Sequence, residues 1–551
     1  MRIADQRRRL PWVLILWAFL PLACFGQQVE IREFVRTGHL AMMRWPDFSD
    51  LRAPLQRFYE PSGFAPAWMS DGEPKPLALS LIEILRHAEE VGLSAEDYDA
   101  SRWPDRLQLL KTSPDSMTIA CFDVALTVSA MRYASALVVG RVNPRSIGYH
   151  MDLAPKSFDP ESFLWNQVMT SSNLEQTFQS IEPTFATYRR TKQALARYIQ
   201  LAQLDDGEQL PMVRKTIEPG QAYAGIPRLA RLLRLVGDLS TDAAQYQNSQ
   251  TYDDTLVDAV KSFQRRHGLE ADGRLGVATI RQLNIPLQER VRQLQLALER
   301  WRWLPTSFPA PPIFINIADF RLRALDDSRK VVLDMRVVVG RSIRTQTPVF
   351  SAEMTHVIFR PYWNVPRSIL LNEILPQVER DRSYLVRKNF EVTTRDGRVV
   401  ARGDVSDEIL KELLQGSLTV RQTPGPDNSL GLVKLVFPND HDVYLHDTPA
   451  TRLFARSRRD FSHGCIRVEK PAELAAWVLR NNPGWTMDRV QEAMQHGDDD
   501  VAVKLTERIP VFIVYGTAVV YEDNEVHFSE DIYRFDARLA TAIAKGYPYP
   551  R

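Results

Sequence analysis

The sequence predicts a multidomain α+β protein, and three observations support this prediction. Its 551 residues exceed what one hydrophobic core usually organises, and its 44% hydrophobic content is ample for burial. Apolar residues recur at helical spacing through the first half of the chain. From about residue 312 they form short β-rich runs separated by Gly, Pro, Asn and Asp. We therefore expect a helical domain, a small three-helix domain and a mainly antiparallel β domain with a helical insertion.

Residues 1–26 have the pattern of an export signal. Arginines at positions 2 and 7–9 precede an apolar run at 10–25, and Gly26 is small enough to precede a cleavage site. Cleavage after Gly26 is our first interpretation, a retained membrane anchor the second, and lipidation at Cys24 the third. In each case the remaining chain lies outside the cytoplasm.

Residues 45–220 are expected to form the helical domain. A helix is predicted over 77–91 by apolar residues at helical spacing, and Gly92 is a natural stop signal. A second apolar stretch, 119–139, is long enough to span a bilayer. Asp123 and Arg132 within it favour a packed helix of a soluble domain instead. Cys121 lies in the same stretch and is interpreted as a buried, inert thiol.

Two further domains follow. Residues 222–290 show helical periodicity, with a turn signal at Asp272-Gly273, and predict the small three-helix domain. Residues 311–535 predict the β domain, in which the polar, helical stretch 369–422 is interpreted as an insertion that caps a groove. Residues 536–551 are left as a C-terminal tail without a role.

The most informative motif is Ser462-His463-Gly464-Cys465-Ile466-Arg467, which follows His446 at a distance of 19 positions. A free thiol is only slightly ionised at neutral pH, so a nucleophilic cysteine needs a neighbouring base. Histidine suits this task because it can take the proton from sulfur and return one to a leaving amine. The separation is typical of two adjacent strands joined by a loop. Cys465 is therefore the candidate nucleophile and His446 the candidate base.

Neighbouring residues are assigned supporting roles. The amides of Gly464 and Cys465 are candidate oxyanion donors, and the Asp447 carbonyl could orient the His446 ring. His463 and Ser462 are expected to shape the site through hydrogen bonds, since Ser462 lacks the glycine elbow of a serine nucleophile. The candidate substrate-binding residues are Arg467, Tyr444 and Trp363. Two alternatives stay open: Arg467 could instead pair with Glu469 or Asp460, and the two aromatic residues could be core residues.

These residues resemble a known family. His446, its spacing to the Cys465 motif and the motif itself are similar to the signature of the L,D-transpeptidase (YkuD) catalytic domain, and the segments 362–366, 424–431 and 437–439 resemble its large periplasmic subgroup. Segments 92–98 and 140–144 resemble the scaffold domain of that subgroup. Phe263-Gln264, Gly268-Leu269, Asp272-Gly273 and Gly276 resemble a peptidoglycan-binding domain, although each also serves as an ordinary turn or core residue.

The resemblance implies a reaction and a location. Cys465 would attack the carbonyl of the diamino acid in a tetrapeptide donor stem, expel the terminal D-alanine and form a thioester. The side-chain amine of an acceptor stem would then resolve the thioester into a 3→3 cross-link of peptidoglycan. The resemblance also implies a periplasmic protein, acylation of Cys465 by carbapenems, and other wall-synthesis enzymes as partners.

Two other functions stay open on the sequence. One is a noncatalytic wall-binding scaffold. The other uses the same donor chemistry with water, a free D-amino acid or a lipoprotein lysine as acceptor. No cofactor or metal is required, because the spacing of His441, His446, His463 and Cys465 matches no common zinc pattern. A net charge of +1 gives no basic surplus of the kind that nucleic-acid binders usually carry.

Overall fold

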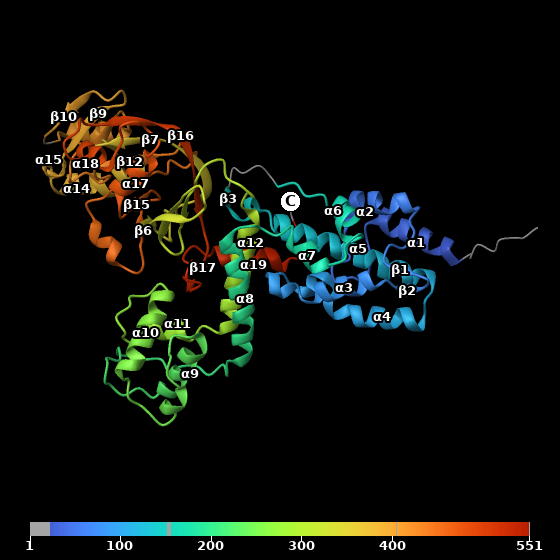
Figure 1. Cartoon of the computed structure of the whole chain (residues 1–551). Helices are drawn as coiled ribbons and strands as arrows, with labels where there is room; N and C mark the ends of the chain where they lie inside the picture. The colour runs from blue at the N-terminus through green and yellow to red at the C-terminus, as the bar shows by residue number, and fades with distance from the viewer. Residues whose placement is uncertain (1–22, 151–155, 404, 550–551) are drawn as a thin grey trace, which may run out of the picture. The chain divides into compact units, whose positions relative to one another are not determined.

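The computed structural model describes residues 23–150, 156–403 and 405–549 (Figure 1). Its internal contacts divide it into two compact units. The first unit contains Met1–His87, Ser94–Ala134 and Asp159–Ser180. The second contains Ala88–Leu93, Ser135–Phe158 and Ile181–Arg551. Most of the predicted export segment lies outside the described residues.

The first unit is helical, as the sequence predicts. Its elements are α1 (Ala23–Thr37), α2 (Arg52–Tyr59), α3 (Pro76–Arg86), α4 (Trp103–Thr112), most of α5 (Ser116–Val139), α6 (Pro160–Phe163), η7 (Leu164–Val168), α7 (Leu174–Gln179) and a hairpin of β1 (Met69–Ser70) and β2 (Glu73–Pro74).

Among the described residues, α5 is the one helix long and apolar enough to cross a membrane, and 83% of its most apolar window is buried inside the protein. Asp123 within α5 is fully buried and accepts hydrogen bonds from the Tyr59 hydroxyl (2.7 Å) and the Trp68 amide (2.8 Å). A paired buried carboxylate of this kind is a feature of a packed helix, so that prediction is confirmed.

Two long helices of the second unit, α8 (Ala186–Leu204) and α12 (Leu287–Trp303), pack against each other, and a three-helix module lies between them in the chain. The module consists of α9 (Ile226–Val236), α10 (Asp254–Arg266) and α11 (Val277–Leu283). The side-chain amide of Gln264 donates to Asp272 Oδ1 (3.0 Å), and its oxygen accepts from the Gly273 amide (2.8 Å). Gly273 adopts a φ of +73°, which favours glycine. These motif residues therefore hold the turn between α10 and α11.

The β domain is built on a closed sheet. Its eight strands are β4 (Ile313–Asn316), β5 (Arg321–Leu325), β6 (Val331–Gly340), β7 (Val349–Phe359), β12 (Val433–Val436), β13 (Leu445–His446), β15 (Ile466–Val468) and β16 (Val501–Val514). The strand order is β12-β13-β15-β6-β5-β4-β16-β7, and β12 also pairs with β7. The sheet therefore closes on itself without free edges along this path.

Short strands and helices complete this domain. β3 (Tyr149–His150) and β14 (Asp460–Ser462) pair in parallel with β7 and β6, whereas most pairings in the sheet are antiparallel. Core residues from several strands are fully buried, among them Leu322, Val337, Leu435, Leu445, Ile466 and Ile513. The other elements are α17 (Pro471–Val478), α18 (Met487–Gln495), and the paired strands β17 (Ala518–Val520) and β18 (Val526–Phe528). The predicted α+β class with a mainly antiparallel β domain is confirmed.

The insertion between β7 and β12 has its own core and its own sheet. Its helical elements are α13 (Arg367–Ile369), η9 (Leu370–Ile374), α14 (Leu375–Arg380), α15 (Tyr384–Arg387) and α16 (Asp407–Gln415), and its sheet has the order β10-β9-β11-β8, with β8 (Trp363–Asn364), β9 (Phe390–Thr394), β10 (Val399–Ala401) and β11 (Leu418–Gln422). Val378, Leu413 and Val420 are among the residues of this separate core. The insertion predicted as helical thus has its helices and also a four-stranded sheet, which the sequence did not indicate because these strands of two to five residues are too short to show a clear period of two.

The residues assigned to a tail are also ordered. They form most of α19 (Phe535–Ala544), in which Leu539 is fully buried. Asp536 lies 2.6 Å from the guanidinium of Arg300 on α12, and both side chains are buried. The folded structure thus extends beyond residue 535.

Candidate active site

Adjacent parallel strands bring the two central residues of the motif to one face of the sheet. Leu445 pairs with Ile466, and His446 pairs with Arg467. Successive side chains of a strand point to opposite faces, so Leu445 and Ile466 face the core. Continuing the register by one residue places Cys465 opposite Tyr444. Tyr444, His446, Cys465 and Arg467 therefore share the other face.

The His446 ring is held in one tautomer by the backbone. Its Nδ1 lies 2.6 Å from the Asp447 carbonyl oxygen, which can only accept, so Nδ1 carries the proton. Burial, with the nearby charges of Arg467 and Lys434, lowers the pKa of His446 to about 3. The ring is thus neutral at physiological pH, and Nε2 is the nitrogen able to accept a proton.

Cys465 is half-buried and its sulfur lies 3.5 Å from the Asp442 carbonyl oxygen, to which the thiol donates. Burial raises the pKa of the thiol, whereas hydrogen bonds from Tyr444 and the positive charge of Lys434 lower it. Cys121 is also a free cysteine, but it is buried and its pKa is raised to about 11. Cys465 is the more accessible of these two thiols, which is the setting that a nucleophile requires.

The loop that carries Cys465 is held by hydrogen bonds to two side chains, Ser462 and Thr347. Ser462 Oγ donates to the Cys465 carbonyl (2.6 Å) and accepts from the Gly464 amide (3.2 Å), while Thr347 Oγ1 donates to the Gly464 carbonyl (2.7 Å). Gly464 has a φ of +119°, a conformation that side chains rarely allow. Because the Gly464 amide is engaged by Ser462, the Cys465 amide is the stronger candidate for an oxyanion donor.

The Asp447 carbonyl accepts the hydrogen bond from His446, and the Asp447 side chain accepts hydrogen bonds from backbone amides. Its carboxylate accepts from the Leu432 amide (2.9 Å) and the Thr448 amide (2.6 Å). A Cβ at Gly431 would lie 2.3 Å from Asp447 Oδ2, so this position requires glycine. The carboxylate therefore connects Leu432, which precedes β12, to Thr448, which follows β13.

Arg467 is a half-buried cation that forms no ion pair with a carboxylate among the described residues. Glu469 instead pairs with Arg336, and Asp460 pairs with Arg458. The alternative that Arg467 braces the loop through one of these acids was therefore wrong, because other arginines already hold them. Its Nε is buried and has no hydrogen-bond partner among the described residues. Burial and the charge of Arg341 lower the pKa of Arg467, as expected of a guanidinium that has no carboxylate partner.

His463 and Trp363 connect to the insertion. His463 Nε2 lies 2.5 Å from Glu373 Oε1 on η9. Trp363 lies on β8, where it packs against the core of the insertion and has its ring centre 6.1 Å from that of Phe390. This packing accounts for Trp363 without a substrate.

Sequence reasoning missed Lys434. It lies on β12 directly opposite His446, and its Nζ is 3.9 Å from the centre of the Tyr444 ring. The available signal was a charged residue alternating with apolar ones in Val433-Lys434-Leu435, which places it on the outer face of a buried strand. Within the described ranges, no cluster of three or more His, Cys, Asp or Glu side chains could hold a metal ion.

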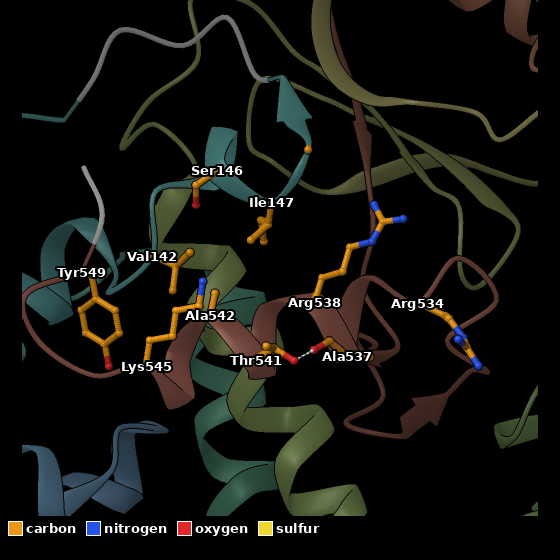
Figure 2. Close-up of a pocket in the computed structure, with 11 residues that line it drawn as sticks. Val142, Ser146, Ile147, Arg534, Ala537, Arg538, Thr541, Ala542, Lys545 and Tyr549 are labelled. Atoms are coloured by element: carbon orange, nitrogen blue, oxygen red, sulfur yellow. Dashed lines mark hydrogen bonds between the residues drawn. The ribbon is translucent and has the colours of Figure 1, made fainter.

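A separate cavity of about 600 Å³ lies elsewhere in the second unit (Figure 2). Its lining comes from the turn at 146–148 and from α19, and includes Val142, Arg538, Thr541 and Lys545. None of the predicted site residues lines it. The cavity therefore has no part in the chemistry considered for Cys465.

Family comparisons divide the chain into three matched regions. Residues 311–513 match the L,D-transpeptidase catalytic domain (YkuD), residues 53–195 match a scaffold domain, and residues 228–283 match a domain described as "Putative peptidoglycan binding domain". A Haemophilus influenzae protein named "Putative L,D-transpeptidase" is 30% identical over 311 residues, which cover 54% of this chain. The match spans 62% of that relative's length.

Two solved structures are similar to part of the chain. An L,D-transpeptidase from Xylanimonas cellulosilytica is 16% identical, with a TM-score of 0.18, and the match covers 55% of this chain and 100% of that one. An L,D-transpeptidase from Stackebrandtia nassauensis is 12% identical, with a TM-score of 0.21, covering 53% and 95%. At these TM-scores the two structures add nothing to the assignment.

Proposed function

We propose that this chain, whose residues 311–513 belong to the L,D-transpeptidase catalytic-domain family, forms 3→3 cross-links in peptidoglycan through a thioester on Cys465. One observation supports this most strongly: the register of β13 and β15 puts Cys465 on the same face as a neutral His446 of defined tautomer. A neutral base beside a half-buried thiol is the arrangement that cysteine acyl transfer needs.

The first half-reaction forms the thioester. His446 Nε2 takes the proton from the Cys465 thiol, and the sulfur attacks the carbonyl carbon of the diamino acid in the donor stem. The Cys465 amide donates to the resulting oxyanion. The carbon–nitrogen bond to the terminal D-alanine then breaks, and His446 returns the proton to the leaving amine.

The second half-reaction reverses these roles. The side-chain amine of an acceptor stem attacks the thioester carbonyl while His446 takes a proton from the nitrogen. The carbon–sulfur bond breaks, the new amide forms, and the proton returns to the Cys465 sulfur. The two half-reactions therefore regenerate the Cys465 thiol and the neutral His446, and they consume no cofactor.

Substrate contacts are assigned by the charges and contacts at the site. Arg467 has a buried Nε without a partner, and a stem-peptide carboxylate would supply one. Tyr444 lies on the face shared with Cys465 and is assigned to the groove. Trp363 is kept as a residue of the insertion, whose proposed role is to exclude water from the thioester.

The remaining regions are proposed to place this chemistry at the wall. Residues 222–290 would bind peptidoglycan, residues 45–220 would act as a scaffold, and residues 1–26 would export the chain to the periplasm. The family of the catalytic domain acts on peptidoglycan, which lies outside the cytoplasm. We propose stem peptides as the donor and acceptor, carbapenems as inhibitors that acylate Cys465, and other wall-synthesis enzymes as partners.

The test is mass spectrometry of the full chain incubated with a tetrapeptide-containing disaccharide. The wild type should show a thioester adduct and 3→3 dimers, Cys465→Ala should show neither, and Cys121→Ala should match the wild type. An adduct with tripeptide alone would identify water as the acceptor. Folded wild-type protein that forms no adduct would overturn the proposal and favour a wall-binding scaffold.

A further inference from the structure

We propose that Lys434 is a positioning residue that stabilises the Cys465 thiolate formed when His446 takes the proton, by charge and by fixing the Tyr444 ring whose hydroxyl contacts the sulfur. This inference deepens the proposed function and rests on Cys465 as its nucleophile.

Strand geometry puts Lys434 on the reactive face. It pairs with His446 across the antiparallel β12–β13 ladder, so the two side chains point the same way. Its neighbours Val433 and Leu435 are fully buried on the opposite face. A lysine at this position cannot turn into the core and is directed to the side that Cys465 shares.

Lys434 contacts the residue next to the nucleophile. Its Nζ lies 3.9 Å from the centre of the Tyr444 ring, within the range of a cation–π interaction. The Tyr444 carbonyl also accepts a hydrogen bond from the Ile466 amide (3.1 Å), which fixes the backbone beside Cys465. Tyr444 is therefore held at ring and backbone, and its hydroxyl is placed to donate to the sulfur.

The charge of Lys434 is not consumed by a structural ion pair. No carboxylate lies within ion-pair distance of its Nζ in the described part of the chain, and Asp442 and Asp500 act on it only at longer range. Burial lowers its pKa, while a thiolate on Cys465 raises it. Each group thus favours the charged form of the other, and Lys434 can neutralise the thiolate once the proton has left the sulfur.

The same charge acts on the base. Lys434 and Arg467 both disfavour an imidazolium at His446. A proton taken from the sulfur is therefore held weakly and passes readily to the leaving amine. Several other charged or titratable groups interact electrostatically with Lys434, with Cys465 or with both: His356, Asp442, Tyr444, His446, Arg467 and Asp500. Arg341 in turn interacts with Arg467.

The experiment measures the thiolate directly. The rate at which iodoacetamide alkylates Cys465 in the full chain is followed from about pH 6 to about pH 11.5 by peptide mass spectrometry, which resolves Cys465 from the other cysteines. In Lys434→Met we expect the midpoint to rise by about one pH unit, and the rate at pH 7 to fall about tenfold. Lys434→Arg should restore most of the shift. Lys470→Met, which removes an exposed lysine after β15, should match the wild type.

A folded Lys434→Met variant with the wild-type midpoint would overturn the inference. If that variant fails to fold, Lys434→Gln takes its place, and an unchanged midpoint there overturns it equally. Alkylation needs no stem peptide. A Lys434-dependent midpoint in a protein that forms no stem adduct would therefore overturn the proposed function and leave the role of Lys434 standing.

Discussion

His463 Nε2 lies 2.5 Å from Glu373 Oε1, so the loop that carries Cys465 is joined to the insertion between β7 and β12. Both side chains are partly exposed, at 30% and 46%. An ion pair this exposed contributes little to stability. The contact gives His463 a side-chain partner other than Cys465.

Glu373→Gln should loosen the insertion while leaving the β domain folded. With the charge removed, we expect up to about fivefold more thioester hydrolysis relative to cross-linking, because the insertion would exclude water less well. The ratio of tripeptide to dimer, measured by mass spectrometry, checks this. Glu379→Gln, which changes an exposed glutamate of α14, is the matched control. An unchanged ratio in Glu373→Gln would remove the proposed role of the contact.

His446→Ala should abolish the proton transfer on which acylation depends. General base catalysis typically contributes about 100- to 10,000-fold, so we expect the acylation rate of Cys465 by a carbapenem to fall by that range. Intact-protein mass spectrometry over time measures the rate. His441→Ala, which changes an exposed histidine five residues earlier, should acylate like the wild type. Equal rates in the two variants would exclude His446 as the base.

Ser462→Ala should destabilise the nucleophile loop. The change removes one hydroxyl that serves both the Cys465 carbonyl and the Gly464 amide, and an unsatisfied buried polar group costs about 1–3 kcal/mol. We expect a Tm lower by a few degrees and slower acylation. Thermal unfolding measures the first, and Ser457→Ala provides a comparison outside this network. A wild-type Tm in Ser462→Ala would show that other contacts hold the loop.

The pKa of His446 predicts a pH dependence of stability. Above about pH 6.5 the ring is neutral in both states, and its titration has no effect. As the pH falls from there toward 3, the unfolded chain gains a proton that the folded protein excludes, so the free energy of unfolding decreases. His446→Asn removes this contribution, which we expect to reach about 3 kcal/mol at pH 4. The Tm of the wild type should thus fall more steeply than that of the variant between pH 7 and 4; parallel curves would contradict the lowered pKa.

The sequence predicted the fold class and the packed helix around Asp123, and both predictions succeeded because apolar periodicity is a local signal. The roles of Cys465 and His446 stay a prediction, drawn from a short ordered motif whose strands the structure places side by side. The sequence did not indicate β9 to β11 or α19. Short strands have little periodicity, and α19 is stabilised by burial of Leu539 and by the pair of Asp536 with Arg300, which lies more than 200 residues away.

The sequence by itself determined which groups are available: a thiol, a histidine 19 positions earlier, a glycine and an arginine. Only the tertiary structure decided how they are used. The parallel register of β13 and β15 placed the thiol and the histidine on one face, and the pairing of Glu469 and Asp460 with other arginines left Arg467 without an acid. The pairing of β12 with β13 placed Lys434 opposite His446. The physical reason is that strand register and burial set both the neighbours and the pKa of each group, and both depend on residues distant in the chain.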